Sequence, residues 1–150
     1  MSSSARLIPC PHCAALNRVP ADKPPLHANC GRCAAPLFTG RPLDLTSSNF
    51  GRHADKADIP LVVDFWAGWC GPCRQMAPAF EEAAAQVEPL ARFGKLDTEA
   101  EPTIAARFQI RSIPTLAILL QGREIARRSG GAPAHAIVDW VRQSLPAAGP

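Results

Sequence analysis

From Leu43 to the end of the chain, short continuous apolar runs alternate with segments in which apolar residues recur at helical spacing. The short runs predict buried strands over residues 59–66, 90–97, 116–120 and, more weakly, 123–129. The helical spacing predicts helices over residues 70–87, 101–108 and 133–145. The last two strands flank a Gln121-Gly122 turn and can pair as an antiparallel hairpin. This order predicts an α/β fold with a mixed central sheet flanked by helices.

The first 42 residues have a different composition. Seven of the sixteen prolines and four of the six cysteines lie there, with Phe38 as the single aromatic residue. Apolar burial alone cannot offset the ordering entropy of a segment this short and proline-rich, so it needs a cross-link. We therefore expect two domains, residues 1–42 and residues 43–150.

Charge and hydropathy exclude several classes of protein. The formal net charge is +3, and the whole excess lies in residues 1–45, with five basic and two acidic side chains. Four thiolates and one Zn²⁺ would add −2 and leave +1, so we expect no nucleic-acid partner. No apolar run approaches the roughly 20 residues of a membrane span. Residues 1–10 lack the hydrophobic stretch of a secretory signal, so we expect a cytoplasmic protein with no membrane partner.

All six cysteines fall in Cys-x-x-Cys pairs. Cys10/Cys13 and Cys30/Cys33 are separated by sixteen residues, a spacing typical of four-cysteine zinc sites. Two thiolates on each of two tight turns can complete a tetrahedron around one ion. Iron is the main metal alternative, because an all-sulfur tetrahedron suits both zinc and iron. Structural disulfides between these cysteines would instead fit a secreted protein. We expect one structural zinc ion bound by all four cysteines.

The third pair, Cys70-Gly71-Pro72-Cys73, follows a predicted strand and opens a predicted helix. Side chains three positions apart on a helix can form a disulfide with little backbone movement, and proline in the first turn costs no hydrogen bond. Free N–H groups and the helix dipole favour a thiolate, so we expect an exposed, nucleophilic Cys70 and a buried Cys73. The Cys10 pair lacks this context, because three prolines within residues 14–25 prevent a sustained helix. The third pair is therefore predicted to be a redox-active dithiol.

Asp64 is the second informative residue, because it interrupts the apolar strand over residues 59–66. Burial there raises the pKa of a carboxyl group, which can then accept a proton from Cys73 directly or through water. Lys95 lies on the next predicted strand and could reach Asp64. An edge position facing solvent is the weaker interpretation, given the apolar flanks.

Residues 63–73 (VDFWAGWCGPC) resemble the active-site signature of the thioredoxin family. Lys95, Pro78, Gly130 and residues 111–115 (RSIPT) fall where thioredoxins keep a lysine, a helix-kinking proline, a glycine and a cis-proline loop. Together with the four-cysteine segment, the chain is similar to the zinc-containing bacterial thioredoxin 2 group. The resemblance implies a thioredoxin fold preceded by a small zinc-ribbon-like module.

The resemblance also implies a reaction cycle. Cys70 attacks a disulfide in a protein substrate, and Cys73 resolves the mixed disulfide with Asp64 and Lys95 nearby. An NADPH-dependent thioredoxin reductase then recharges the dithiol, and the protein is expected to be a monomer. A flat apolar surface would bind substrate, with a cis Ile113–Pro114 bond within it. The residues assigned to substrate binding are Trp66, Trp69, Gly71, Pro72, Ile113, Pro114 and Gly130.

Two other functions are compatible with the sequence. The same fold supports disulfide isomerases and oxidases, although the Gly-Pro dipeptide between the cysteines favours a reductase. The protein could also be a redox sensor whose zinc thiolates regulate it on oxidation. The sequence does not indicate which proteins are reduced.

Overall fold

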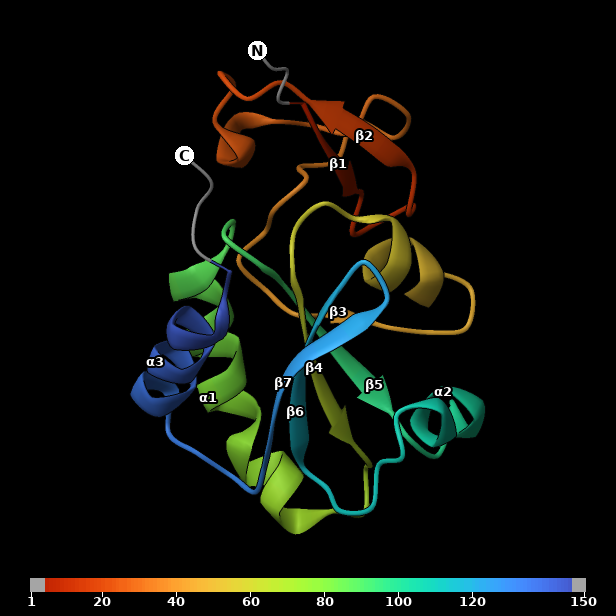
Figure 1. Ribbon diagram of the computed structural model, residues 1–150, viewed down its shortest axis with the longest axis vertical. Coiled ribbons are helices and arrows are strands. Elements are labelled where there is room, and N and C mark those ends of the chain that lie inside the picture. Colours follow the sequence, from red (N-terminus) through yellow and green to blue (C-terminus); the bar gives the residue numbers. More distant parts are fainter. Residues whose placement is uncertain (1–4, 147–150) are drawn as a thin grey trace.

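The computed structural model describes residues 5–146 (Figure 1). Residues 1–4 and 147–150 lie outside this range. They include the outer ends of both expected domains and the first four of residues 1–10, on which the expectation about a secretory signal rests.

A five-stranded sheet forms the centre of the larger part of the molecule. In spatial order its strands are β3 (Leu43–Asp44), β5 (Arg92–Asp97), β4 (Leu61–Trp66), β6 (Thr115–Leu120) and β7 (Arg123–Ser129). β3, β5 and β4 run parallel, while β6 is antiparallel to β4 and β7 is antiparallel to β6. The predicted mixed sheet and the predicted C-terminal hairpin are both confirmed.

Helices cover both faces of this sheet (Figure 1). α1 (Gly71–Val87) and α3 (Ala134–Ser144) pack on one face, and α2 (Pro102–Arg107) lies on the other. Side chains alternate between the faces, so Val62 and Phe93 pack under α1 and α3, whereas Val63 and Phe65 belong to the cluster on the opposite side. Burial on both faces explains why the central strands are nearly continuous apolar runs.

The N-terminal module has its own small core. It contains an antiparallel hairpin of β1 (Arg6–Pro9) and β2 (Leu16–Val19), followed by the short 3₁₀ helix η1 (Pro25–His27). Its buried cluster also includes Ala57 and Ile59, from the segment that leads into β4. The module therefore completes its core against the larger part of the chain.

Several elements were not predicted or begin later than predicted. β1, β2 and β3 are too short to show a pattern, and the π-helix η2 (Arg52–Lys56) lacks helical periodicity. β4 begins at Leu61 because Pro60 has no N–H for a sheet ladder. β5 begins at Arg92 because a turn precedes it, in which the Leu90 N–H donates to the Val87 carbonyl at 2.9 Å.

The module packs against the end of the sheet where β4 and β5 begin (Figure 1). The backbone of Leu7 is bonded to Asp58 in both directions: its N–H donates to Asp58 Oδ2 at 2.8 Å, and its carbonyl accepts from the Asp58 N–H at 2.9 Å. The N-terminus of α1 lies at the opposite end of the sheet (Figure 1). No helix among residues 5–146 has the length and apolar character needed to cross a membrane.

Candidate functional site

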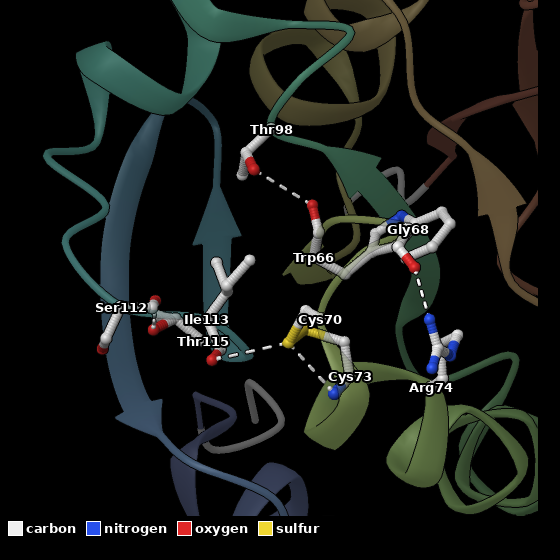
Figure 2. Close-up of a disulfide and its surroundings, with 9 residues drawn as sticks. All are labelled: Trp66, Gly68, Cys70, Cys73, Arg74, Thr98, Ser112, Ile113 and Thr115. Carbon is white, nitrogen blue, oxygen red and sulfur yellow. Dashed lines mark hydrogen bonds between the residues drawn. A yellow bond between two sulfur atoms is a disulfide. The ribbon is translucent and has the colours of Figure 1, made fainter.

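The cysteine pair at the start of α1 forms a disulfide (Figure 2). Cys70 occupies the N-cap position, and Pro72 lies in the first turn. The Cys73 N–H donates to Cys70 Sγ at 3.2 Å, and the two Cα atoms are 5.3 Å apart. An N–H of the first helical turn therefore points at the sulfur of the first cysteine, where it would stabilise a thiolate.

The loop before β6 faces this disulfide (Figure 2). Cys70 Sγ lies 3.8 Å from the carbonyl oxygen of Ile113, and the Ile113–Pro114 bond is cis, as expected. The Gly130 N–H donates to the Pro114 carbonyl at 2.9 Å, which ties the end of β7 to the same loop. Gly130 itself has a φ of 91°, a conformation that favours glycine.

The expectation of an exposed Cys70 is wrong for the disulfide form, in which Cys70 is 3% exposed and Cys73 is 1% exposed. The first turn of α1 and the Ile113 loop enclose the sulfur atoms from two sides. Trp69, by contrast, is 67% exposed and lines a shallow cavity of about 180 Å³. The other residues lining this cavity are Thr98, Ala105, Ile110, Arg111, Ser112 and Ile113.

The expected apolar surface is thus only partly open. Trp69 and Gly130 are exposed and Ile113 is half-buried, but Pro114 is buried. Trp66 is half-buried, and Lys95 Nζ lies 4.4 Å from the centroid of its ring. Gly71 is half-buried and Pro72 is exposed at the tip of α1.

Asp64 is fully buried, as predicted. It shares a sheet face with Val62, the face covered by α1, and its register partner on β5 is Lys95. Neither carboxylate oxygen has a hydrogen-bond partner among the described residues. Burial raises the pKa of Asp64 to about 7, and the positive charge of Lys95 opposes this shift. Asp64 can therefore exchange a proton near neutral pH on the face where Cys73 lies.

The four N-terminal cysteines come together at two turns of nearly identical structure. The Ala14 N–H donates to the Cys10 carbonyl at 2.9 Å, and the Ala34 N–H donates to the Cys30 carbonyl at 2.9 Å. Ala14 and Ala34 have φ values of 65° and 67°. Both turns direct backbone N–H groups at sulfur: the His12 N–H lies 3.3 Å from Cys10 Sγ, and the Arg32 N–H lies 3.3 Å from Cys30 Sγ.

The positions of these sulfurs fit a tetrahedral metal ion. Cys10 and Cys33 are 3.6 Å apart at Sγ, Cys13 and Cys30 are 3.6 Å apart, and all four sulfurs lie within 4.8 Å of one another. Four Zn–S bonds of about 2.3 Å in a tetrahedron would place the sulfurs about 3.8 Å apart. The residues present therefore fit a closed, all-thiolate metal site.

Three polar residues near these sites were missed in the sequence. Asn17 links the two turns: its Oδ1 accepts from the Gly31 N–H at 2.9 Å, and its Nδ2 lies 3.5 Å from Cys30 Sγ. Arg74 donates to the Gly68 carbonyl at 2.8 Å, and Thr98 Oγ1 donates to the Trp66 carbonyl at 3.1 Å (Figure 2). Asn17 and Thr98 bond to atoms 13 or more residues away, and Arg74 bonds to a carbonyl in the loop before its helix, so no periodic pattern indicates any of the three.

Comparisons with known proteins agree with this geometry. The thioredoxin family model matches residues 41–143, and the model for the N-terminal zinc ribbon of thioredoxin 2 matches residues 9–35. Thioredoxin C-3 of Corynebacterium nephridii is 42% identical over 139 residues, which cover 93% of this chain and 95% of that protein. The putative thioredoxin 2 of Streptomyces coelicolor is 41% identical over 102 residues, covering 68% of this chain and 75% of that protein.

A solved mutant thioredoxin from Halobacterium salinarum shares the fold, with a TM-score of 0.65 at 23% identity, covering 75% of this chain and 97% of that one. A cystine at the start of the first helix of a mixed α/β sheet, together with these relatives, defines a thiol–disulfide oxidoreductase. The chain belongs to the thioredoxin family and carries the zinc-ribbon module of thioredoxin 2 at its N-terminus.

Proposed function

We propose that this protein reduces disulfides in other proteins through a dithiol–disulfide cycle at Cys70 and Cys73. The observation that carries the proposal is the Cys73 N–H, which points at Cys70 Sγ from 3.2 Å at the start of a 17-residue helix. A helix N-terminus of this kind stabilises the thiolate that attacks a disulfide.

In the reduced protein, the Cys70 thiolate attacks one sulfur of the substrate disulfide. The attacked sulfur forms a mixed disulfide with Cys70, and the other substrate sulfur leaves as a thiolate. Cys73 gives its proton to Asp64, directly or through water, and attacks Cys70 Sγ. The second substrate thiolate leaves, and the Cys70–Cys73 disulfide remains, so two electrons have passed to the substrate. Lys95 limits the pKa of Asp64, so that the carboxylate is available as a base near neutral pH.

Substrate would bind across the open surface beside the disulfide. Trp69 and Ile113 line the shallow cavity there, and Gly130 borders the loop. Pro72 and Gly71 at the tip of α1 leave room for an approaching chain, and a Cβ at Gly71 would meet no atom within 4 Å. The buried Pro114 and half-buried Trp66 would act by holding this surface in place.

Residues 1–42 would form the zinc-binding domain and residues 43–150 the redox domain. Cys10, Cys13, Cys30 and Cys33 would hold one zinc ion, which when bound supplies a cross-link that a module this small needs. None of these four cysteines forms a disulfide, which favours a reducing compartment such as the cytoplasm. An NADPH-dependent thioredoxin reductase would return the electrons, and the protein would act as a monomer.

Insulin reduction by the full chain, with NADPH and a bacterial thioredoxin reductase, tests this function. We expect NADPH oxidation that depends on both proteins. If the protein reduces insulin with a chemical dithiol but not with the reductase, the Cys70–Cys73 cycle stands and thioredoxin reductase is not its electron donor. A redox potential near about −270 mV is expected for a reductase, whereas a value above about −200 mV would indicate an isomerase or oxidase.

A further inference from the structure

One arginine connects the sheet to the zinc-ribbon module. Arg92, the first residue of β5, is 2% exposed. Its Nη2 donates a 2.8 Å hydrogen bond to the carbonyl oxygen of Pro9, in the peptide bond that leads into Cys10. Its guanidinium also lies over the ring of Phe38, 4.4 Å from the centroid. Arg92 thus contacts the chain just before the first cysteine turn and just after the second.

Glu88, in the turn that precedes β5, provides a second connection between the sheet and the N-terminal part of the chain. It is 6% exposed, its Oε2 accepts from the Phe93 N–H at 3.1 Å, and its Oε1 accepts from the Gly40 N–H at 3.1 Å. Gly40 lies in the segment between the module and β3 and has a φ of 72°. Glu88 therefore holds this connecting segment against the start of β5, beside Arg92.

Arg92 is the one buried lysine or arginine among residues 5–146. Burying a cation is costly unless negative charge and hydrogen bonds compensate it. Burial lowers the pKa of Arg92 to about 10, and the negative charges of Glu88 and Cys10 oppose this shift. Four thiolates around a divalent ion carry a formal net charge of −2, so a zinc-loaded site would strengthen the need for a nearby cation.

We propose that Arg92 is a positioning residue for the zinc site. Its guanidinium fixes the Pro9 carbonyl, and with it the first cysteine turn, and it places a positive charge beside a site whose four thiolates and one Zn²⁺ would carry a net charge of −2. The inference rests on the zinc binding proposed above. Arg92 takes no part in thiol–disulfide exchange, because β5 begins at the end of the sheet that lies away from the start of α1 (Figure 1).

Zinc release from the full chain into excess chelator tests this role. Metal analysis of the wild-type protein comes first: absence of bound zinc would refute the zinc site itself, independently of Arg92. Given one zinc per chain, Arg92→Met should bind zinc about 10- to 100-fold more weakly, the range found when residues that orient metal ligands are removed, and should release it correspondingly faster. Arg92→Lys keeps the charge and should fall between the two.

The matched control is Arg127→Met. Arg127 also donates to a backbone carbonyl, that of Phe108, and pairs with Glu124, but it lies on β7 away from the module. Its zinc release should equal that of wild-type protein even if the variant loses stability. Amide exchange over residues 6–19 should increase in Arg92→Met and stay unchanged in Arg127→Met.

Cobalt spectra add a readout that a purely structural role would not move. In the cobalt-loaded protein, losing the positive charge near Cys10 should shift the sulfur-to-metal charge-transfer bands to lower energy. Wild-type release rates and wild-type bands in a folded Arg92→Met protein would overturn the proposal. If that variant does not fold because Glu88 loses the nearby positive charge, the double variant Glu88→Gln with Arg92→Met replaces it. If neither variant folds, Arg92→Lys decides. A wild-type release rate in the deciding variant would again overturn the proposal.

Discussion

The pairs Cys10–Cys13 and Cys70–Cys73 have the same spacing and share one local contact. In each, the N–H of the second cysteine points at the sulfur of the first, at 3.4 Å in the N-terminal pair and 3.2 Å in the pair at α1. The chain then diverges at the next residue. Ala14 turns back with a φ of 65°, whereas Arg74 continues the helix that began at Gly71.

This difference in the backbone gives the sulfurs of each pair different neighbours. The turn at Ala14 directs both sulfurs toward a second loop at Cys30–Cys33, whose sulfurs lie 3.6 Å from them. The helix at Cys70 instead provides a dipole and leaves the two sulfurs to bond each other. Cys-x-x-Cys spacing thus sets the distance between two sulfurs, and the backbone that follows favours a cluster of four sulfurs in the first case and an internal disulfide in the second.

The largest expected effect is on disulfide reduction, which should depend on the Cys70–Cys73 pair and not on the N-terminal cysteines. Cys70→Ser should lower disulfide reduction by at least about a thousandfold, because it removes the attacking sulfur. Cys73→Ser should still attack but accumulate mixed disulfides, visible by mass spectrometry as adducts that a reducing agent releases. Cys10→Ser is the control, and its turnover should stay within a few-fold of wild type. Comparable activity losses in Cys10→Ser and Cys70→Ser would contradict the division of roles.

The next effect is on stability, which the N-terminal cysteines should provide to their own module but not to the part from β3 onward. Replacing all four N-terminal cysteines with serine should abolish zinc binding and unfold residues 6–38, because zinc contributes on the order of 10 kcal/mol to the folding of such modules. The part from β3 onward should stay folded on the two clusters that flank its sheet. Amide exchange mapped along the chain measures both outcomes. Fast exchange throughout β4 and β6 in this variant would show that the redox part depends on the module.

The buried carboxylate offers a smaller, pH-dependent effect confined to the redox part. The pKa of Asp64 is about 7 in the folded protein, against an ordinary value of 3.8. The folded state therefore binds more protons than the unfolded state between these values, and stability falls as pH rises through that window. Asp64→Asn removes this penalty, so it should match wild type near pH 4 and be more stable above pH 7 by on the order of 4 kcal/mol.

Urea unfolding of the oxidised protein at several pH values tests this expectation, with Asp139→Asn on the exposed side of α3 as a control that should show no such trend. In Asp64→Asn, resolution of the mixed disulfide should also slow near neutral pH. A stability gain independent of pH would remove the titration of Asp64 as its cause.

Much of the redox part could be predicted because its residues obey local rules. Burial on both faces produces apolar runs at β4 and β6, and the cysteine pair, Asp64 and the Ile113–Pro114 loop lie in recognisable segments. The N-terminal hairpin could not be predicted, because strands of four residues with mixed burial carry too few apolar positions. Arg92 and Glu88 were missed because each acts on backbone atoms far away in sequence, which no periodicity records.

The smallest expected effect tests whether the backbone after each pair limits the metal turns. Ala14 and Ala34 both adopt the left-handed conformation, which costs a residue with a Cβ atom roughly 1–2 kcal/mol. Glycine relieves that strain but loses more entropy on folding, roughly 0.4–1 kcal/mol, so each substitution should stabilise the module by about 0.5–1 kcal/mol. Ala34 is exposed and Ala14 is half-buried, so Ala34→Gly loses less packing and should gain more. Slower exchange of the Cys30 N–H, which donates to Ala35, would report this gain in the zinc-loaded protein. Ala85→Gly, at an exposed position inside α1, is the control and should destabilise its helix by about 1 kcal/mol. Unchanged or faster exchange at Cys30 in Ala34→Gly would show that the left-handed turn is not a source of strain.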